Sequence, residues 1–317
     1  MLQSKIYKIS TFTLKEWQFV HSLIDRSEFS TALSFFTKAR LPKVETAVID
    51  DLYFMEAFIR LLIVQGYQVK ALPIIAKVIE RLYTIEQQYS SLMAKVLIYN
   101  AQCLMAVEDH PHVISIYQSA YNILENNHTN QSDFGQIYLG LSQLDESVKD
   151  WELYLENALE CFKRVQNCVG EASALNAYGI YYGRLQDSGL ALDFFQKAME
   201  ISQENHDLRR IAGCLNNQAV LIYLNDQNPN ENKGFNLINE AINISKKIVS
   251  LEFLVQHHKA LVQFYHNKND NISAIPHLQT IYELQEKRGL LSENRKLKYQ
   301  DLLFQKKPLL DNLSPIN

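Results

Sequence analysis

GEASALNAYGIYYGRLQDSGLALDFFQKAMEISQENHD, residues Gly170–Asp207, predicts two helices joined by a tight turn. In its first half, Leu175, Tyr178 and Tyr182 are spaced to share one face of a helix with about 3.6 residues per turn. The residues Gln186–Gly189 then favour a turn and a helix cap. The second half has an apolar face of the same spacing, formed by Ala191, Phe194, Phe195, Ala198 and Ile201. The stretch therefore predicts a helix-turn-helix unit.

Small and large residues alternate where these two helices would face each other. Gly179, Ala191 and Ala198 allow a close approach, and Tyr182 and Phe195 fill the space beside them. This order resembles the tetratricopeptide repeat (TPR), a helix-turn-helix unit that stacks into a solenoid.

The sequence departs from the TPR pattern at two positions. Gln203 stands where the pattern usually has proline, and Leu175 stands where it often has tryptophan.

The small–large–small triplet of the second helix recurs along the chain. Its first residues are Ala32, Ala71, Val113, Ala158, Ala191, Gly234 and Ala274. The spacing is about forty residues, longer than the roughly 34 residues of an ordinary TPR. Among the triplets are Ala32-Phe36-Ala39 and Ala158-Phe162-Val165, and a matching first helix precedes each one.

The chain is therefore expected to be all-α, a right-handed α-solenoid of about seven TPR-like helix-turn-helix repeats. A helix from about Leu291 to Phe304 would cap the last repeat, because a solenoid must cover the apolar face at its end. A single domain is expected over residues 12–307, followed by a frayed tail over residues 308–317.

Composition narrows the functional classes. The 317 residues carry a net charge of −4 and no dense basic run, which argues against nucleic acid as a partner. The longest apolar stretch is short and contains Arg60, and the N-terminus lacks a signal-peptide core, so no membrane partner and a cytoplasmic location are expected. The four cysteines form no C-x-x-C pair and are interpreted as buried thiols.

Motifs for catalysis, cofactors and metals are absent. The sequence has no phosphate-binding loop, dinucleotide fingerprint, H-E-x-x-H or G-x-S-x-G. His110 and His112 are interpreted as a turn that enters a helix. His257 and His258 point about 100° apart on a helix, so they share a metal poorly, and one is expected to be half-buried and the other exposed. Neither enzyme activity nor a cofactor nor a metal is predicted.

Binding is the better-supported class, because the first helices of stacked pairs line the concave side of a solenoid. The candidate peptide- or partner-binding residues on these helices are Arg60, Lys95, Gln102, Asn176, Arg184, Asn216, Asn217, Tyr223, Lys259 and Gln263. An asparagine amide can donate to and accept from a peptide backbone, and Lys or Arg suits a carboxylate.

A second resemblance rests on the repeat length and on Asp207–Asn217, DLRRIAGCLNN. These features look like the long-repeat subset of the TPR superfamily, found in bacterial peptide-pheromone receptors of the Rap type and in cell-polarity adaptors. The resemblance implies an extended peptide or partner segment in the concave groove. The DNA-binding or phosphatase helices of such receptors have no recognisable counterpart here, because the first repeat begins near residue 12.

The leading hypothesis is a non-catalytic scaffold or regulator that holds a peptide or protein segment in this groove. One alternative is an intracellular receptor for a small signalling peptide that changes the superhelical shape. Another is an enzyme of unrecognised type, for which Glu56 and Arg60 are the only hint, although they fit an i,i+4 ion pair more simply. A homodimer through Trp17, Phe35 and Phe36 is compatible with each hypothesis.

Overall fold

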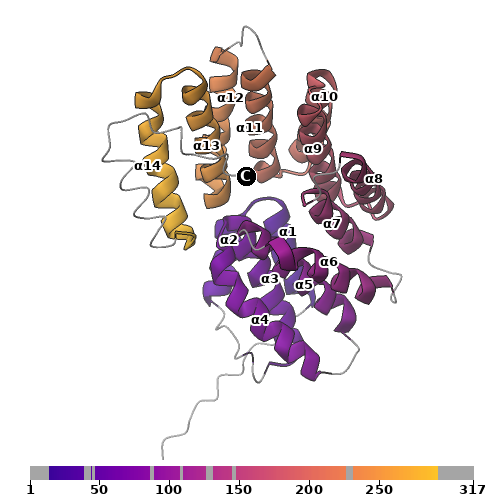
Figure 1. Cartoon of the computed structure of the whole chain (residues 1–317). Helices are drawn as coiled ribbons and strands as arrows, with labels where there is room; N and C mark the ends of the chain where they lie inside the picture. The colour runs from indigo at the N-terminus through magenta and orange to yellow at the C-terminus, as the bar shows by residue number, and fades with distance from the viewer. Residues whose placement is uncertain are drawn as a thin grey trace, which may run out of the picture.

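The computed structural model describes residues 14–38, 44, 47–85, 89–107, 110–125, 131–144, 148–225 and 231–291. These ranges form fourteen helices and contain no strand (Figure 1). The helices pack as seven consecutive antiparallel pairs. The pairs are α1 (Leu14–Asp25) with α2 (Phe29–Lys38), α3 (Ile49–Gln65) with α4 (Gln68–Thr84), α5 (Ser90–Ala106) with α6 (His110–Glu125), α7 (Gln131–Ser142) with α8 (Val148–Arg164), α9 (Cys168–Arg184) with α10 (Ser188–Glu204), α11 (Leu208–Asn225) with α12 (Glu231–Ile248), and α13 (Leu251–Asn267) with α14 (Asn271–Arg288). The predicted α-solenoid is confirmed.

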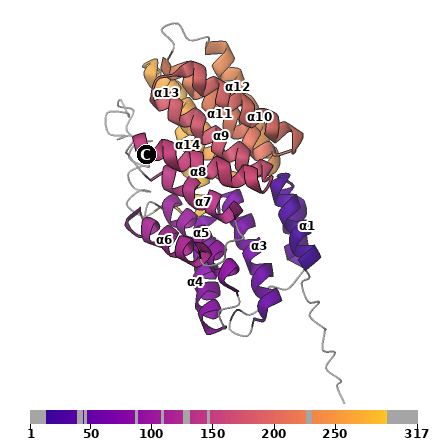
Figure 2. The same cartoon turned by 90° about the vertical axis from the view of Figure 1, so that its right-hand side faces the viewer.

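The first helix of each pair lies on the inside of the superhelix. Successive odd-numbered helices contact one another from α1 to α13, whereas no successive even-numbered helices in the described part of the chain do so to a comparable extent. The path is therefore shorter on the odd-numbered side. Figures 1 and 2 show α1–α6 on one level of the superhelix and α9–α14 on the level above. We call the surface formed by the odd-numbered helices the inner face.

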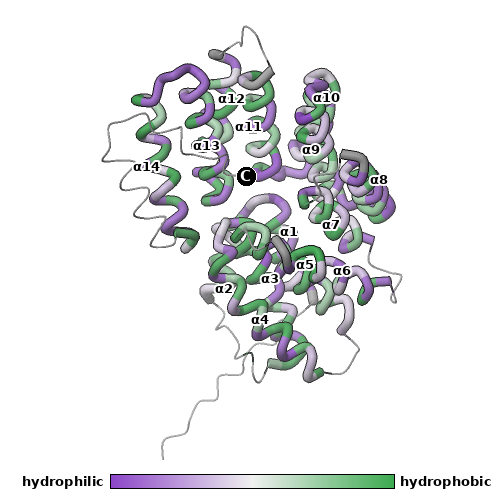
Figure 3. Tube along the Cα trace, in the orientation of Figure 1, coloured by the Kyte–Doolittle hydropathy of each residue, from purple (hydrophilic) through white to green (hydrophobic). Residues whose placement is uncertain are grey.

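The small residues that open the triplets are buried on the even-numbered helices, as the sequence predicts. The large residue that follows inserts against the first helix of the pair. At Gly179, an added Cβ would lie 2.4 Å from Phe195 Cε1, so only glycine permits this approach. Hydrophobic and hydrophilic residues alternate along the helices, as amphipathic packing requires (Figure 3).

One triplet is predicted wrongly. Val165 is 43% exposed, because α8 ends at Arg164 and Gln166 takes a left-handed conformation with φ 53°. The chain has therefore left the helix before Val165 could reach the core. Ala39, the last residue of the first triplet, lies outside the described residues.

The tight turns between helices have a common chemistry. Gln186 and His206 adopt φ of 61° and 57°, which ends the preceding helix. Each is followed by an aspartate that caps the next helix: Asp187 Oδ1 accepts from Leu190 N at 3.0 Å, and Asp207 Oδ1 accepts from Arg210 N at 3.0 Å. A left-handed residue followed by an Asx cap makes a turn of about three residues, which holds the two helices antiparallel.

The array also contacts itself across a full superhelical turn. Gln68 Nε2 donates to Glu252 Oε2 at 3.2 Å, while Arg288 donates from Nε to Gly66 O at 3.0 Å and from Nη2 to Gln68 Oε1 at 3.3 Å. Gly66 has φ 93°, and an added Cβ would lie 2.8 Å from Glu252 N. The α3–α4 turn thus docks tightly on the start of α13 and the end of α14.

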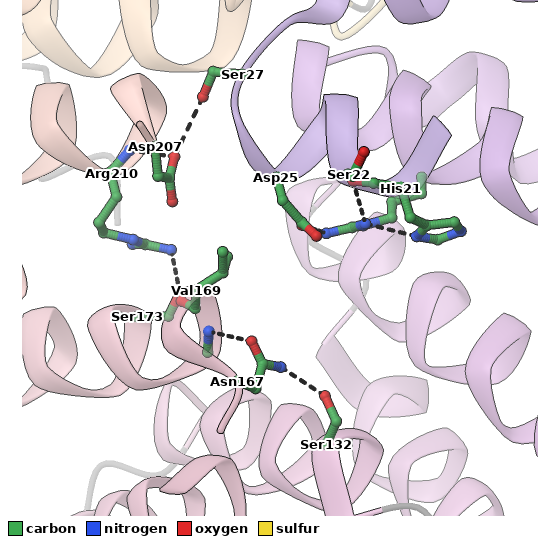
Figure 4. Close-up of polar contacts among 12 residues, drawn as sticks. His21, Ser22, Asp25, Ser27, Ser132, Asn167, Val169, Ser173, Asp207 and Arg210 are labelled. Carbon is green, nitrogen blue, oxygen red and sulfur yellow. Dashed lines mark hydrogen bonds and ion pairs between the residues drawn. The ribbon is translucent and has the colours of Figure 1, made fainter. Parts of the chain in front are cut away.

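A second contact of this kind joins the α1–α2 turn to the α10–α11 turn. Ser27 Oγ donates to Asp207 Oδ1 at 3.3 Å (Figure 4). It also accepts from Arg209 N at 3.0 Å. Ile248, at the end of α12, packs into the hydrophobic cluster of α1–α3. We call these interactions, together with those of Gly66, Gln68, Glu252 and Arg288, the closure contacts.

The ends of the predicted domain are only partly described. The described chain begins with α1 at Leu14. The predicted capping helix after Leu291 and the predicted tail over residues 308–317 lie outside the described residues.

Candidate functional site

The inner face of the first pairs is organised around a buried carboxylate. Glu56 on α3 is fully buried and accepts from Trp17 Nε1 at 2.6 Å and from Tyr99 OH at 2.8 Å, and His21 Nε2 lies 3.0 Å from its Oε2. Burial alone would raise its pKa, but the facing His21, Lys95 and Trp17 lower it to about 2. Glu56 is therefore ionised with both oxygens occupied.

Arg60 completes this network one turn further along α3. It donates from Nη1 to His21 Nδ1 at 2.6 Å and forms an ion pair with Asp25 (Figure 4 shows His21 and Asp25). Since His21 Nδ1 accepts, its proton lies on Nε2, facing Glu56. The prediction of an i,i+4 ion pair between Glu56 and Arg60 is wrong, because each side chain binds partners on α1 instead. We call Trp17, His21, Asp25, Glu56, Arg60 and Tyr99 the charged network.

On the adjoining part of the inner face, formed by α5 and α7, polar side chains have fewer hydrogen-bond and ion-pair partners. Lys95 Nζ lies 5.2 Å from the Trp17 ring centroid and has no carboxylate within ion-pair distance in the described chain. Gln102 Nε2 reaches Gln136 Oε1 at 3.5 Å, a weak contact between α5 and α7. Asp133 on α7 is 5% exposed, and its Oδ2 has no hydrogen-bond partner among the described residues.

The middle parts of the inner helices in the last three pairs are joined by neutral side chains. Asn217 Nδ2 on α11 donates to Asn176 Oδ1 on α9 at 3.0 Å. On the other side of α11, His257 Nδ1 on α13 lies 3.0 Å from Asn216 Oδ1, and Ser245 Oγ on α12 lies 2.9 Å from His257 Nε2. We call these five residues the amide ladder, because amide and imidazole side chains join successive helices.

Burial makes His257 neutral. It is 1% exposed, and burial, with a smaller contribution from His258, lowers its pKa to about 3. With Asn216 as acceptor, the proton lies on Nδ1, and Nε2 accepts from Ser245. The expectation that one of the two histidines is exposed is wrong, since His258 is also buried and its Nδ1 lies 3.0 Å from His277 Nδ1.

Further polar bonds join neighbouring pairs along the same side. Arg210 Nη2 on α11 donates to Ser173 Oγ on α9 at 2.5 Å, and Asn167 Nδ2 donates to Ser132 Oγ on α7 at 2.7 Å (Figure 4). Asn167 also caps α9 by accepting from Gly170 N at 2.9 Å. Polar side chains thus link successive inner helices from α1 to α13.

The structure divides the predicted binding residues into three groups. Arg60 belongs to the charged network and Asn176, Asn216 and Asn217 to the amide ladder, while Lys95 and Gln102 lie beside the charged network on α5. The remaining four lie towards the C-terminal ends of α9, α11 and α13 or within α13: Arg184, Tyr223, Lys259 and Gln263.

Three members of this last group have contacts that explain them locally. Arg184 stacks over Trp151 at 4.7 Å, and Tyr223 packs on Phe264 with ring centroids 4.3 Å apart. Gln263 is exposed and donates to Asn267 on its own helix at 2.8 Å. These contacts do not bring the group together with either cluster.

Sequence reasoning missed His21, Asp133 and His257. Each lies on a first helix at a position that faces the preceding or following first helix. The signal was the 35- to 43-residue separation of polar residues on successive first helices, as in His21–Glu56 and Tyr99–Glu56.

No protein-family description matches the chain, and no curated protein matches it either. Among solved structures, the chain is similar to the apo form of RapI, with a TM-score of 0.58 and 14% sequence identity. The match covers 86% of this chain and 98% of the RapI chain. The fold is that of RapI. The Rap-type resemblance predicted from the sequence is therefore confirmed at the level of the fold.

The described residues also bear on two other classes of site. No group of three or more His, Cys, Asp or Glu side chains there is placed to hold a metal ion. Within the same ranges, none of the helices combines the length and apolarity needed to span a bilayer.

Proposed function

We propose that this chain is a non-catalytic, cytoplasmic regulatory scaffold that holds an extended peptide or partner segment against its inner face. The observation that carries the proposal is the polar lining of the seven odd-numbered helices. Packing between helices does not require polar side chains, and buried ones are costly unless satisfied. An inner face rich in amides and charges suits a peptide backbone, whose donors and acceptors need partners. The fold shared with RapI supports the same class of function.

A second candidate, a peptide receptor that changes shape, is favoured by the closure contacts. They join pairs that are distant in sequence, so the pitch of the superhelix depends on them. A ligand that touched both the charged network and the amide ladder would bind differently to open and closed forms, and only such a difference can shift the equilibrium between them.

Ile180 provides the first test. It is 37% exposed on α9, one turn beyond Asn176, whereas Leu192 on α10 is similarly exposed at 41% on the second helix of the same pair. Phage-displayed random peptides of about eight residues would be selected on the full chain. We expect Ile180→Arg to reduce binding of the selected peptides at least tenfold, because the guanidinium blocks the inner face, and Leu192→Arg to leave it unchanged.

Failure to select any peptide, or equal effects of the two substitutions, would contradict the proposal. Small-angle scattering with a selected peptide distinguishes the two candidates. A change in radius of gyration supports the receptor, whereas an unchanged profile at saturation supports the rigid scaffold.

A further inference from the structure

Asp133 is a buried carboxylate whose Oδ2 differs from the oxygens of another buried carboxylate, Glu56. Its Oδ2 has no hydrogen-bond partner among the described residues, although the side chain is almost fully buried. Glu56, by contrast, is contacted by two donors and a histidine. A buried charged oxygen without a donor is costly, so its persistence calls for an explanation.

The charged groups around Asp133 in the described part of the chain do not supply a donor to its Oδ2. Glu56 repels it, and the oxygens of Glu56 already take the donors of Trp17 and Tyr99. Lys95 attracts Asp133 but lies over the Trp17 ring instead of forming an ion pair. The result is a carboxylate held between helices with an unmet need for an N–H donor.

Amide groups continue this surface along the same two helices. Gln136 lies three residues after Asp133 on α7, and Gln102 lies seven residues after Lys95 on α5. In their mutual contact, at 3.5 Å, the Gln102 carbonyl and the Gln136 amine take no part. A ligand anchored at Asp133 would therefore meet further donors and acceptors on α5 and α7.

We infer that Asp133 is the anchor for a cationic group, an ammonium or a guanidinium, of a ligand bound on the α5–α7 part of the inner face. This inference rests on the proposed function, in which the ligand is a peptide. An ammonium or guanidinium brings several N–H donors and the opposite charge, so it satisfies both needs of the carboxylate. A metal ion fits poorly, because Asp133 belongs to no group of three or more His, Cys, Asp or Glu ligands among the described residues.

Two sources could supply the cation: the free amino terminus of a peptide or a Lys or Arg side chain. Four pools of random peptides of about eight residues separate them, with the terminus free or acetylated and one fixed position occupied by Arg or by its uncharged isostere citrulline. Retention of each pool on the immobilised full chain would be measured at pH 8 by mass spectrometry.

We expect the pools that carry the relevant cation to be retained about ten- to a hundredfold more strongly, the range of a charged hydrogen bond. Preference for free termini identifies the amino terminus, and preference for Arg over citrulline identifies the side chain. Asp133→Asn should abolish the preference, while the same change at Asp193, an exposed residue paired with Lys197 on α10, should not. Lys95→Met should strengthen the preference for cationic peptides, because a positive charge that competes for Asp133 is removed.

The melting temperature of Asp133→Asn shows whether a loss of peptide binding is caused by unfolding. Asp133→Asn removes an unpartnered buried charge, so its melting temperature at pH 8 should equal or exceed that of the unmodified chain. Peptide retention that depends on Ile180 but shows no cation preference, or a preference that survives Asp133→Asn, would overturn the inference alone. Retention of none of the pools would overturn both the inference and the proposed function.

Discussion

The first four helix pairs and the last three join their inner helices with different chemistry. In the charged network, Glu56 and Arg60 are both ionised. Both contact His21 on α1, and Arg60 also forms an ion pair with Asp25 on the same helix. In the amide ladder, Asn216 and His257 carry no charge, and each bond joins a neutral donor to a neutral acceptor. Charged hydrogen bonds are stronger but leave a larger penalty when one partner is lost. We therefore expect substitutions in the charged network to change the free energy of unfolding most. We expect the amide ladder to make the free energy of unfolding depend on pH.

Breaking the charged network should have the largest effect. We expect Glu56→Gln to lower the free energy of unfolding by about 3 kcal/mol, because Trp17, His21 and Tyr99 lose their charged buried acceptor. Urea denaturation followed by circular dichroism measures this. Glu160→Gln, which removes an exposed carboxylate paired with Arg164, should cost less than about 1 kcal/mol. Equal costs would show that the charged network contributes no more than a surface pair.

The amide ladder should make the free energy of unfolding depend on pH. The pKa of His257 falls from 6.5 to about 3 on folding, so the unfolded chain binds its proton more readily. Stability is then complete above about pH 6.5 and is lost as pH falls towards 3, by about 1 kcal/mol per pH unit. Chemical denaturation at pH 7.5 and 5.5 tests this. His257→Asn should be less stable at pH 7.5 but should lose less stability on acidification, and an identical pH dependence in both proteins would exclude His257 as the source.

Substitution of Asp133 should cause the smallest change in the free energy of unfolding. The pH dependence that Asp133 contributes should be opposite in sign to that of His257. Burial, with repulsion from Glu56, raises its pKa to about 6, so the folded state disfavours its charge. The associated stability is present below about pH 3.8 and lost as pH rises through 6. Asp133→Asn should therefore raise the free energy of unfolding at pH 7.5 by about 1 kcal/mol. A fall of similar size would mean that the carboxylate is satisfied in solution.

The fold could be predicted from the sequence because its packing signals are local. Ala191 and Phe195 lie one turn apart on the same helix, and their order fixes which face meets Gly179. Val165 shows the limit of this reasoning, since α8 ends just before it and the left-handed Gln166 follows. The candidate site could be predicted only as a surface: Asn216 was placed on a first helix, but its bond to His257 depends on the rotation of two helices 41 residues apart.

The closure contacts have a consequence for how the protein unfolds. In an ordinary repeat array each unit touches only its neighbours, so the two ends can fray independently. Here Arg288 reaches Gly66 across 222 residues, and Ser27 reaches Asp207 across 180. The first two pairs and the last pairs of the described array therefore stabilise each other, and opening either group exposes the other. Hydrogen exchange should find α3 and α13 opening together, as parts of one cooperative unit that links opposite ends of the chain.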